Sequence, residues 1–238
     1  MSPKSQTLFH FTKSEDKLKS ILLNGFYPNY CLEDCRWYYS KTNYVAVIMT
    51  CFCDIPLSRI SNHIDTYGHY GIGLSREWAV SKHLNPVIYI SEDSNLYNSL
   101  MDIANTDLII DNYNDKKEFK SQLRMLRAHV KPLEGNMVIE GVDKYVKFYK
   151  ENEWRYVPTG RRCIVNKATY DDKPILDELF ERAKKDPLKF KATDIKYIFV
   201  EKEVEVLPMI HFIRSSKLPR SDVLATRVLS METIVRDV

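Results

Sequence analysis

The residue types best suited to chemistry lie in one short stretch, Glu151 to Val157 (ENEWRYV). If this stretch is a β-strand, Glu151, Glu153 and Arg155 project from one face, because side chains alternate between the two faces of a strand. Two carboxylates beside a guanidinium can stabilise a developing positive charge or move a proton. The pattern fits equally a solvated edge strand with an ion pair on one face, and the spacing alone leaves both interpretations open.

A second group of polar residues belongs to the first apolar strand of the chain, Phe9-His10-Phe11-Thr12. In an alternating strand His10 and Thr12 share one face, while Phe9 and Phe11 pack into the core. At the mouth of a cleft, His10 and Thr12 would hydrogen-bond the ribose or the amide of a ligand. The alternative is a histidine whose ring bonds to the backbone near the end of the strand.

Glycines punctuate a later predicted strand, Tyr67 to Leu74 (YGHYGIGL). The stretch lacks the G-x-G-x-x-G pattern of dinucleotide-binding loops and the lysine of a Walker loop. A glycine inside a strand marks the close approach of a ligand or of another part of the chain. A nicotinamide ring against Gly71 and Gly73, with Tyr70 stacked on it, fits this pattern, and so does tight packing.

Four of the five cysteines form two close pairs, Cys31 with Cys35 and Cys51 with Cys53. Structural zinc sites use spacings of about two to four residues within each pair, so the single residue between Cys51 and Cys53 would crowd the ligands. We therefore expect buried cysteines that act as small apolar side chains, and no metal site. The odd number of cysteines and the lack of an apolar leader favour a reduced, cytoplasmic protein.

Composition indicates one globular domain over residues 1–238, with 44% hydrophobic and 28% charged residues. The net charge of +3 is too small to indicate nucleic-acid binding by itself. No run of about 18 apolar residues is present, so no membrane span is expected. The G-x-S-x-G motif of serine hydrolases and the kinase motifs are also missing.

Hydrophobic periodicity predicts the elements that must position these residues. Ser14 can cap a helix that Gly25 ends, and the unbroken apolar run Val45 to Phe52 predicts a buried strand. Polar residues with apolar ones at helical spacing predict a helical insertion at about 94–131. Together these elements predict an α+β fold with a mixed sheet. Strands are expected over 7–11, 45–52, 67–74, 86–90, 145–149, 151–157, 194–200 and 223–230, and further helices over 75–82, 174–184 and 204–213.

The chain resembles a family of abortive-infection phage-resistance proteins, the AbiGi-like group, from about residue 8 to residue 235. The resemblance implies phage defence in a toxin–antitoxin setting and does not name a reaction. The motifs that carry it are LFHFT, CFCDIPLS, YGHYGIGLSREW, NPVIYI and ENEWRYVP, with LKFKATDIKYIFV and TRVLSMETIV in support.

A more distant resemblance is to ADP-ribosyltransferases that modify nucleic acid. Those enzymes begin with a His-x-Thr element, a helix and a glycine, a form that LFHFT and Gly25 repeat here. They end with a strand that bears the catalytic glutamate, for which Glu153 is the candidate. The resemblance implies an ADP-ribosyltransferase-like, mainly antiparallel sheet with flanking helices. One departure is Asp54, which stands in the aromatic turn where the DNA-modifying members have an arginine.

This second resemblance implies that the chain uses NAD as its substrate and modifies RNA or DNA. Glu153 would stabilise the oxocarbenium-like cation and hold the ribose 2′-hydroxyl, and Glu151 would position the acceptor. The residues expected around NAD are His10, Phe11, Thr12, Tyr67, Tyr70, Gly71 and Arg155. The residues expected to contact phosphates are Arg124, Arg127, Lys131, Arg161 and Arg162, which also fit ordinary solvated faces.

Two other functions fit the sequence. A non-enzymatic antitoxin or sensor would neutralise a neighbouring toxin, with exposed aromatic side chains at Trp37, Tyr38 and Tyr39 as the protein interface. A nuclease would need a metal-binding acidic cluster, for which Asp54, Asp65 and Glu153 are weak candidates.

Overall fold

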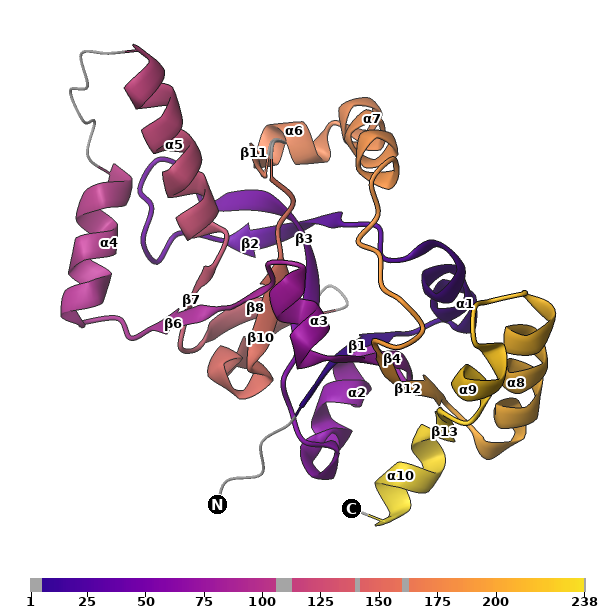
Figure 1. The fold of residues 1–238 in the computed structure, drawn as a ribbon. Coiled ribbons are helices and arrows are strands. Elements are labelled where there is room, and N and C mark those ends of the chain that lie inside the picture. The colour runs from indigo at the N-terminus through magenta and orange to yellow at the C-terminus, as the bar shows by residue number, and fades with distance from the viewer. Residues whose placement is uncertain (1–5, 106–112, 140–141, 160–162, 238) are drawn as a thin grey trace.

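The computed structural model describes residues 6–105, 113–139, 142–159 and 163–237. Within them, nine strands form one sheet that runs through the molecule (Figure 1). Its main path has the order β13-β12-β4-β1-β3-β10-β5, and β2 and β11 also pair with β3. Its pairs are antiparallel except β12 with β13, so the predicted α+β class with a mixed, mainly antiparallel sheet is confirmed. The strands of this sheet are β1 (Thr7–Thr12), β2 (Asn29–Asp34), β3 (Tyr44–Cys53), β4 (Tyr70–Ser75), β5 (Asn85–Pro86), β10 (Glu153–Tyr156), β11 (Ile164–Asn166), β12 (Ile195–Val200) and β13 (Val228–Ser230).

Strand β3 is the centre of this arrangement because four other strands pair with it. Its carboxyl-terminal part pairs with β10 and, at Cys53, with β1, while the part nearer Tyr44 pairs with β2 and β11. Nearly all of its side chains are buried, as the unbroken apolar sequence predicts for a strand covered on both faces. The register places Phe9, Cys53 and Glu153 in one row across three strands.

Helices cover both faces of the sheet, and alternate residues of β1 face them. Leu8 belongs to the core that Trp78 of α3 and Met209 of α8 complete. Phe9, next in sequence, points to the other face and packs in the core that contains Ile64 of α2. The helices are α1 (Glu15–Asn24), α2 (Ser61–Tyr67), α3 (Arg76–Ser81), α4 (Asn95–Asn105), α5 (Tyr113–Arg127), α6 (Lys167–Asp171), α7 (Lys173–Lys184), α8 (Val206–Ser215), α9 (Ser221–Ala225) and α10 (Met231–Asp237).

Local sequence explains where the first helices begin and end. The Ser14 hydroxyl accepts a hydrogen bond from the backbone amide of Lys17, and Ser75 caps α3 in the same way through Trp78. Gly25 ends α1 with a φ of +77°, a conformation that a glycine adopts without strain. The predicted helices over 14–24 and 75–82 are therefore confirmed.

The region around 94–131 contains α4 and α5, as its periodicity predicts, and it lies at the end of the fold opposite α8, α9 and α10 (Figure 1). It leads into β7 (Val130–Pro132), which pairs in parallel with β6 (Ile88–Ile90). A hairpin of β8 (Gly135–Ile139) and β9 (Val142–Val146) follows. That the two helices are an insertion within a single domain stays a prediction.

Several predicted strands are shorter than expected, and one includes a helix. Residues 61–67 form α2, so β4 begins only at Tyr70, after Gly68 has ended the helix with a φ of +110°. Residues 223–225 of the predicted last strand belong to α9, and only Val228–Ser230 are extended. Beyond Val146, the predicted strand 145–149 turns into a short 3-10 helix, η2 (Phe148–Glu151). Two further 3-10 turns are η1 (Leu57–Arg59) and η3 (Glu203–Glu205).

No helix within the described residues is long and apolar enough to cross a membrane.

Candidate functional site

Strand β10 directs two charged side chains into the protein. Glu153 is 6% exposed and Arg155 is fully buried, while Trp154 and Tyr156 point to the other face of the sheet. The strand lies between β3 and β5, so the interpretation as a solvated edge strand is wrong. The predicted strand over 151–157 is also too long, because Glu151 ends η2 and Asn152, with a φ of +43°, turns the chain into β10.

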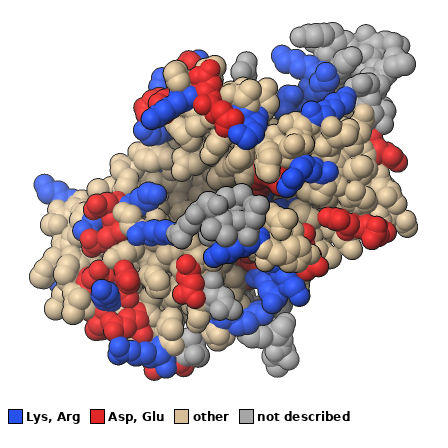
Figure 2. Space-filling model, turned by 180° about the vertical axis from the view of Figure 1, so that it is seen from behind, with Lys and Arg blue, Asp and Glu red and all other residues tan. Residues whose placement is uncertain are grey.

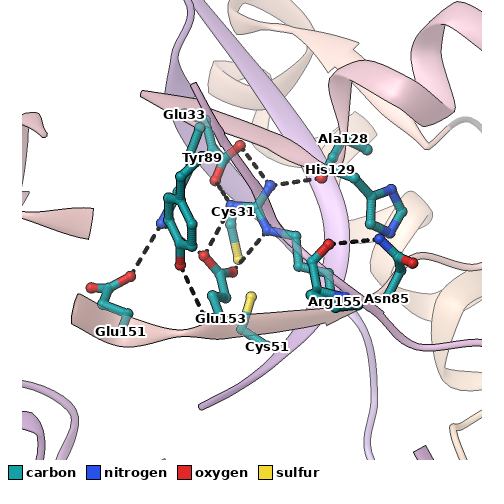
Figure 3. Close-up of polar contacts among 12 residues, drawn as sticks. Cys31, Glu33, Cys51, Asn85, Tyr89, Ala128, His129, Glu151, Glu153 and Arg155 are labelled. Atoms are coloured by element: carbon teal, nitrogen blue, oxygen red, sulfur yellow. Dashed lines mark hydrogen bonds and ion pairs between the residues drawn. The ribbon is translucent and has the colours of Figure 1, made fainter. Parts of the chain in front are cut away.

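Arg155 holds two carboxylates and one carbonyl at once (Figure 3). Its Nε donates to Oε1 of Glu153 at 2.8 Å, and its Nη1 donates to Oε2 of Glu33 at 3.0 Å. Nη1 also donates to the carbonyl of Ala128 at 2.7 Å, just beyond the end of α5. Arg155 therefore ties β10 to β2 and to the end of α5 by charge-assisted hydrogen bonds.

Lys131 of β7 supplies the second cation. Its Nζ lies 2.9 Å from Oε2 of Glu153 and 3.4 Å from Oε2 of Glu151. The other oxygen of Glu151 accepts a hydrogen bond of 2.6 Å from the hydroxyl of Tyr67. We call these five charged residues the ion network: Glu33, Lys131, Glu151, Glu153 and Arg155.

The ion network keeps Glu153 ionised. Burial alone would raise the pKa of Glu153, but Arg155 and Lys131 outweigh burial and hold this pKa well below its usual range. Glu153 and Glu151 in turn keep the pKa of Lys131 high despite its burial. A carboxylate with so low a pKa, and with both oxygens already bonded, is a weak proton acceptor.

Two cysteines lie beside the network (Figure 3). Burial and the neighbouring Glu153 raise the pKa of the Cys51 thiol, and burial together with Glu33 raises the pKa of Cys31 to about 11. Both thiols therefore stay protonated near neutral pH, which disfavours metal binding and nucleophilic attack. In the part of the chain that the structure describes, no group of three or more His, Cys, Asp or Glu side chains is placed to hold a metal ion.

Residues of the ion network line two cavities. The aromatic pocket has a volume of about 340 Å³, and Glu33 and Lys131 form part of its wall. The tyrosine pocket has a volume of about 920 Å³, and Glu151 and Tyr67 form part of its wall. The ion network thus borders two spaces large enough for small ligands.

The residues predicted to bind NAD do not gather in one place. Glu153 shares a row with Phe9, so His10 projects from the opposite face of the sheet. The Nδ1 of His10 lies 2.8 Å from the carbonyl oxygen of Cys51, and its ring packs edge-on against Phe26. Thr12 shares the face of His10, and burial lowers the pKa of His10, as expected for an imidazole in a closed core.

The remaining predicted NAD-binding residues are divided between the two faces. Tyr70 lies on the His10 face, where its hydroxyl donates to Glu205 at 2.9 Å. Phe11 is buried on the other face, and its ring fills the space that a side chain at Gly71 would occupy. Tyr67 lies beside Glu151, and Arg155 itself belongs to the ion network, so these two members of the set lie near Glu153. Their roles toward NAD stay predictions.

The residues predicted to contact phosphates point in several directions. Lys131 faces Glu153 inside the protein, and Arg127 donates from Nε to the hydroxyl of Tyr38 at 3.1 Å. Arg124 is partly exposed on α5, and Arg161 and Arg162 lie outside the described residues. Figure 2 shows acidic and basic side chains interspersed over one face of the molecule, so that face does not form a uniformly basic surface.

Comparisons with known proteins place the chain in a family. A family model described as "Putative abortive phage resistance protein AbiGi, antitoxin" matches residues 24–201. The chain belongs to the AbiGi family. An abortive phage resistance protein AbiGi from Lactococcus lactis subsp. cremoris is 30% identical over 220 residues, and the match covers 79% of this chain and 88% of that protein. No solved structure matches the chain.

The region that the AbiGi model matches contains the whole ion network. It begins at residue 24, after His10 and Thr12, and it ends before α8. The family model therefore covers the part of the chain in which β2, β3, β7 and β10 surround the charged residues. The proposed His-x-Thr element lies outside that part.

Two residues of the candidate site were not predicted from the sequence. Glu33 belongs to β2, inside a segment whose many turn residues and aromatics hid a short strand. Tyr89 of β6 accepts a hydrogen bond from the amide of Glu153 at 2.9 Å. The β-prone run Tyr30-Cys31-Leu32 was a signal for β2, but nothing in the sequence joins Glu33 to Arg155.

Proposed function

We propose that this AbiGi-family chain acts in the cytoplasm as the antitoxin of an abortive-infection system, where it binds and neutralises a partner toxin protein. The description of the matching family model supports this proposal, since it names an antitoxin. The 30% identical relative carries a name from abortive phage resistance, which supports the same process.

The observation that carries the proposal is the state of Glu153. Its Oε1 is bonded to Arg155 and its Oε2 to Lys131, and the residue is 6% exposed. A catalytic carboxylate has to reach its substrate, whereas this one joins β10 to its neighbours. The network therefore supports a binding protein whose shape is fixed by buried ion pairs.

A growth experiment tests the antitoxin function. The chain and the product of the neighbouring gene are expressed in a host, each alone and then together, and growth is recorded. We expect the chain alone to be harmless, the partner to stop growth, and co-expression to restore growth with a complex recoverable from the lysate. Growth arrest by the chain alone would overturn the proposal.

An ADP-ribosyltransferase-like fold and an NAD-dependent activity on RNA or DNA form the second candidate function. One observation favours it: Tyr67 and Glu151 form the wall of the tyrosine pocket together with Arg59, Lys147 and Lys150, cations suited to the phosphates of a dinucleotide. In this case Glu153 would first have to leave Lys131.

Labelled NAD with RNA or DNA tests this second candidate function. Wild type is compared with Glu153→Gln, after circular dichroism has shown that the variant is folded. If the chain is a transferase, the wild-type protein transfers label to the nucleic acid and the Glu153→Gln variant does not. The absence of label with the wild-type chain, or equal labelling by both proteins, excludes Glu153 as a catalytic residue.

A further inference from the structure

The aromatic pocket contains a cation that the protein itself leaves incompletely bonded. The pocket holds about 340 Å³, within the range of small-molecule sites. Apolar and aromatic side chains form most of its wall. They include Leu32, Tyr44, Val130, Pro132, Met137 and Phe148.

The charged side chains of this wall are paired with one exception. Asp34 is bonded to Arg36, with Nε of Arg36 lying 3.0 Å from the carboxylate. Glu33 and Lys131 belong to the ion network. Among the described residues of the wall, Arg127 is the charged side chain for which the structure has no carboxylate partner.

Only part of the Arg127 guanidinium has a bonding partner in the protein. Nε donates to the hydroxyl of Tyr38, and the plane lies over the ring of Tyr39 at 4.0 Å from the centroid. Nη2 is buried and has no hydrogen-bond partner. A position in the last turn of α5 favours a cation through the helix dipole, but the dipole does not satisfy Nη2.

A buried donor without a partner costs free energy. Because Arg127 lines the pocket, a small turn of its guanidinium would let an acceptor bound there recover this free energy. An anionic acceptor would also balance the charge of Arg127, and the wall beyond it suits an apolar body. We propose that the aromatic pocket binds a small organic anion, with a carboxylate or phosphate on Arg127 and an apolar or aromatic body against Tyr44, Val130 and Phe148. This site is independent of the antitoxin function.

Titration calorimetry on the purified full-length chain tests the proposal. The probes are AMP and indole-3-acetate as organic anions, adenosine and indole as their uncharged counterparts, and phosphate and acetate as anions without a body. We expect at least one organic anion to bind at least tenfold more tightly than its uncharged counterpart and than the bare anion. Binding of AMP and not of indole-3-acetate would assign a phosphate ligand, and the reverse result would assign a carboxylate ligand.

Matched variants connect binding to Arg127. Arg127→Met keeps an extended apolar stem over Tyr39, and we expect it to weaken binding by roughly tenfold or more, since it removes a charged hydrogen bond. Arg124→Met, on the same helix and outside the pocket wall, should bind as wild type. If Arg127→Met does not fold, Leu32→Trp replaces it, because this partly exposed residue can block the pocket without touching Arg127.

Three results overturn the proposal. They are wild-type affinity in a folded Arg127→Met or Leu32→Trp variant, equal affinity for the uncharged counterparts, and no binding of any organic anion. Loss of the complex with a partner protein in Arg127→Met, without binding of the small anions, would assign the pocket to a carboxylate side chain of the partner instead.

Discussion

Lys131 and Glu153 form a buried ion pair, with 2.9 Å between Nζ and Oε2, although β7 and β10 belong to different sheets. Arg155 lies on the far side of the same carboxylate and reaches Glu33 of β2. The pair therefore belongs to a network that holds three separate strands at fixed positions. Loss of the network should therefore first lower the free energy of unfolding.

Arg155→Met should destabilise the fold by about 3–5 kcal/mol, because it leaves Glu153 and Glu33 without their shared cation inside the protein. Urea denaturation followed by circular dichroism measures the change. Arg182→Met is the control, since Arg182 pairs with Glu178 at the surface with both side chains mostly exposed. It should change stability by less than about 0.5 kcal/mol. Equal effects of the two substitutions would show that the network is not structural.

The stability of the protein should fall at acid pH through Glu153. Its folded-state pKa lies below the unfolded value, so its contribution is present above about pH 4.3 and is lost as the pH falls toward the folded pKa. Denaturation between pH 3 and pH 6 should show this loss in the wild type. Glu153→Gln, which keeps the shape of the side chain, should be less stable at pH 6 and should show a flatter profile. Parallel profiles would contradict this assignment.

His63 should produce a second pH dependence at higher pH. Burial lowers its pKa to about 4, whereas the unfolded residue titrates near 6.5. The stability is therefore complete above about pH 6.5 and decreases as the pH falls toward 4, by an amount on the order of 1–3 kcal/mol. In His63→Phe, denaturation curves at pH 7 and pH 5 should give nearly the same stability. A persistent difference in this variant would assign the effect to other groups.

Gly71→Ala separates tight packing from ligand binding in β4. An added Cβ would lie 2.6 Å from the ring of Phe11, which is buried, so we expect a loss of about 1–3 kcal/mol. Gly135→Ala is the matched control, because its nearest contact would be an ordinary 3.4 Å to Phe148. Thermal unfolding of both variants provides the comparison. A Gly71→Ala protein with wild-type stability would favour a glycine kept open for a ligand.

The sequence predicted elements well where the pattern was local. A few neighbouring residues were enough to predict each of these elements. Ser14 and Ser75 indicated where two helices begin, and the unbroken apolar run indicated the buried strand β3. Strand β2 was missed because its turn-rich surroundings outweigh six extended residues. The helix α9 replaced part of a predicted strand, and Asp222 in its first turn favours a helix through the helix dipole.

The site was harder to predict than the elements, because the register between paired strands decides which side chains share a face of the sheet. A shift of one residue between β1 and β3 would bring His10 to the side of Glu153, and no local pattern fixes that register. Alternation alone placed Glu153 and Arg155 on one face of the strand, but it did not show that this face is buried. Their partners Glu33 and Lys131 come from distant strands that only the folded chain brings together.

The place of β3 in the chain has a consequence for synthesis on the ribosome. β3 is complete at residue 53, but β10 and β11, which form its second edge, are complete only at residues 156 and 166. Until then the nascent chain exposes a long apolar strand with unpaired amides and carbonyls, the kind of edge that recruits other chains. The second edge of β3 can therefore pair only after residues 153–166 have been translated.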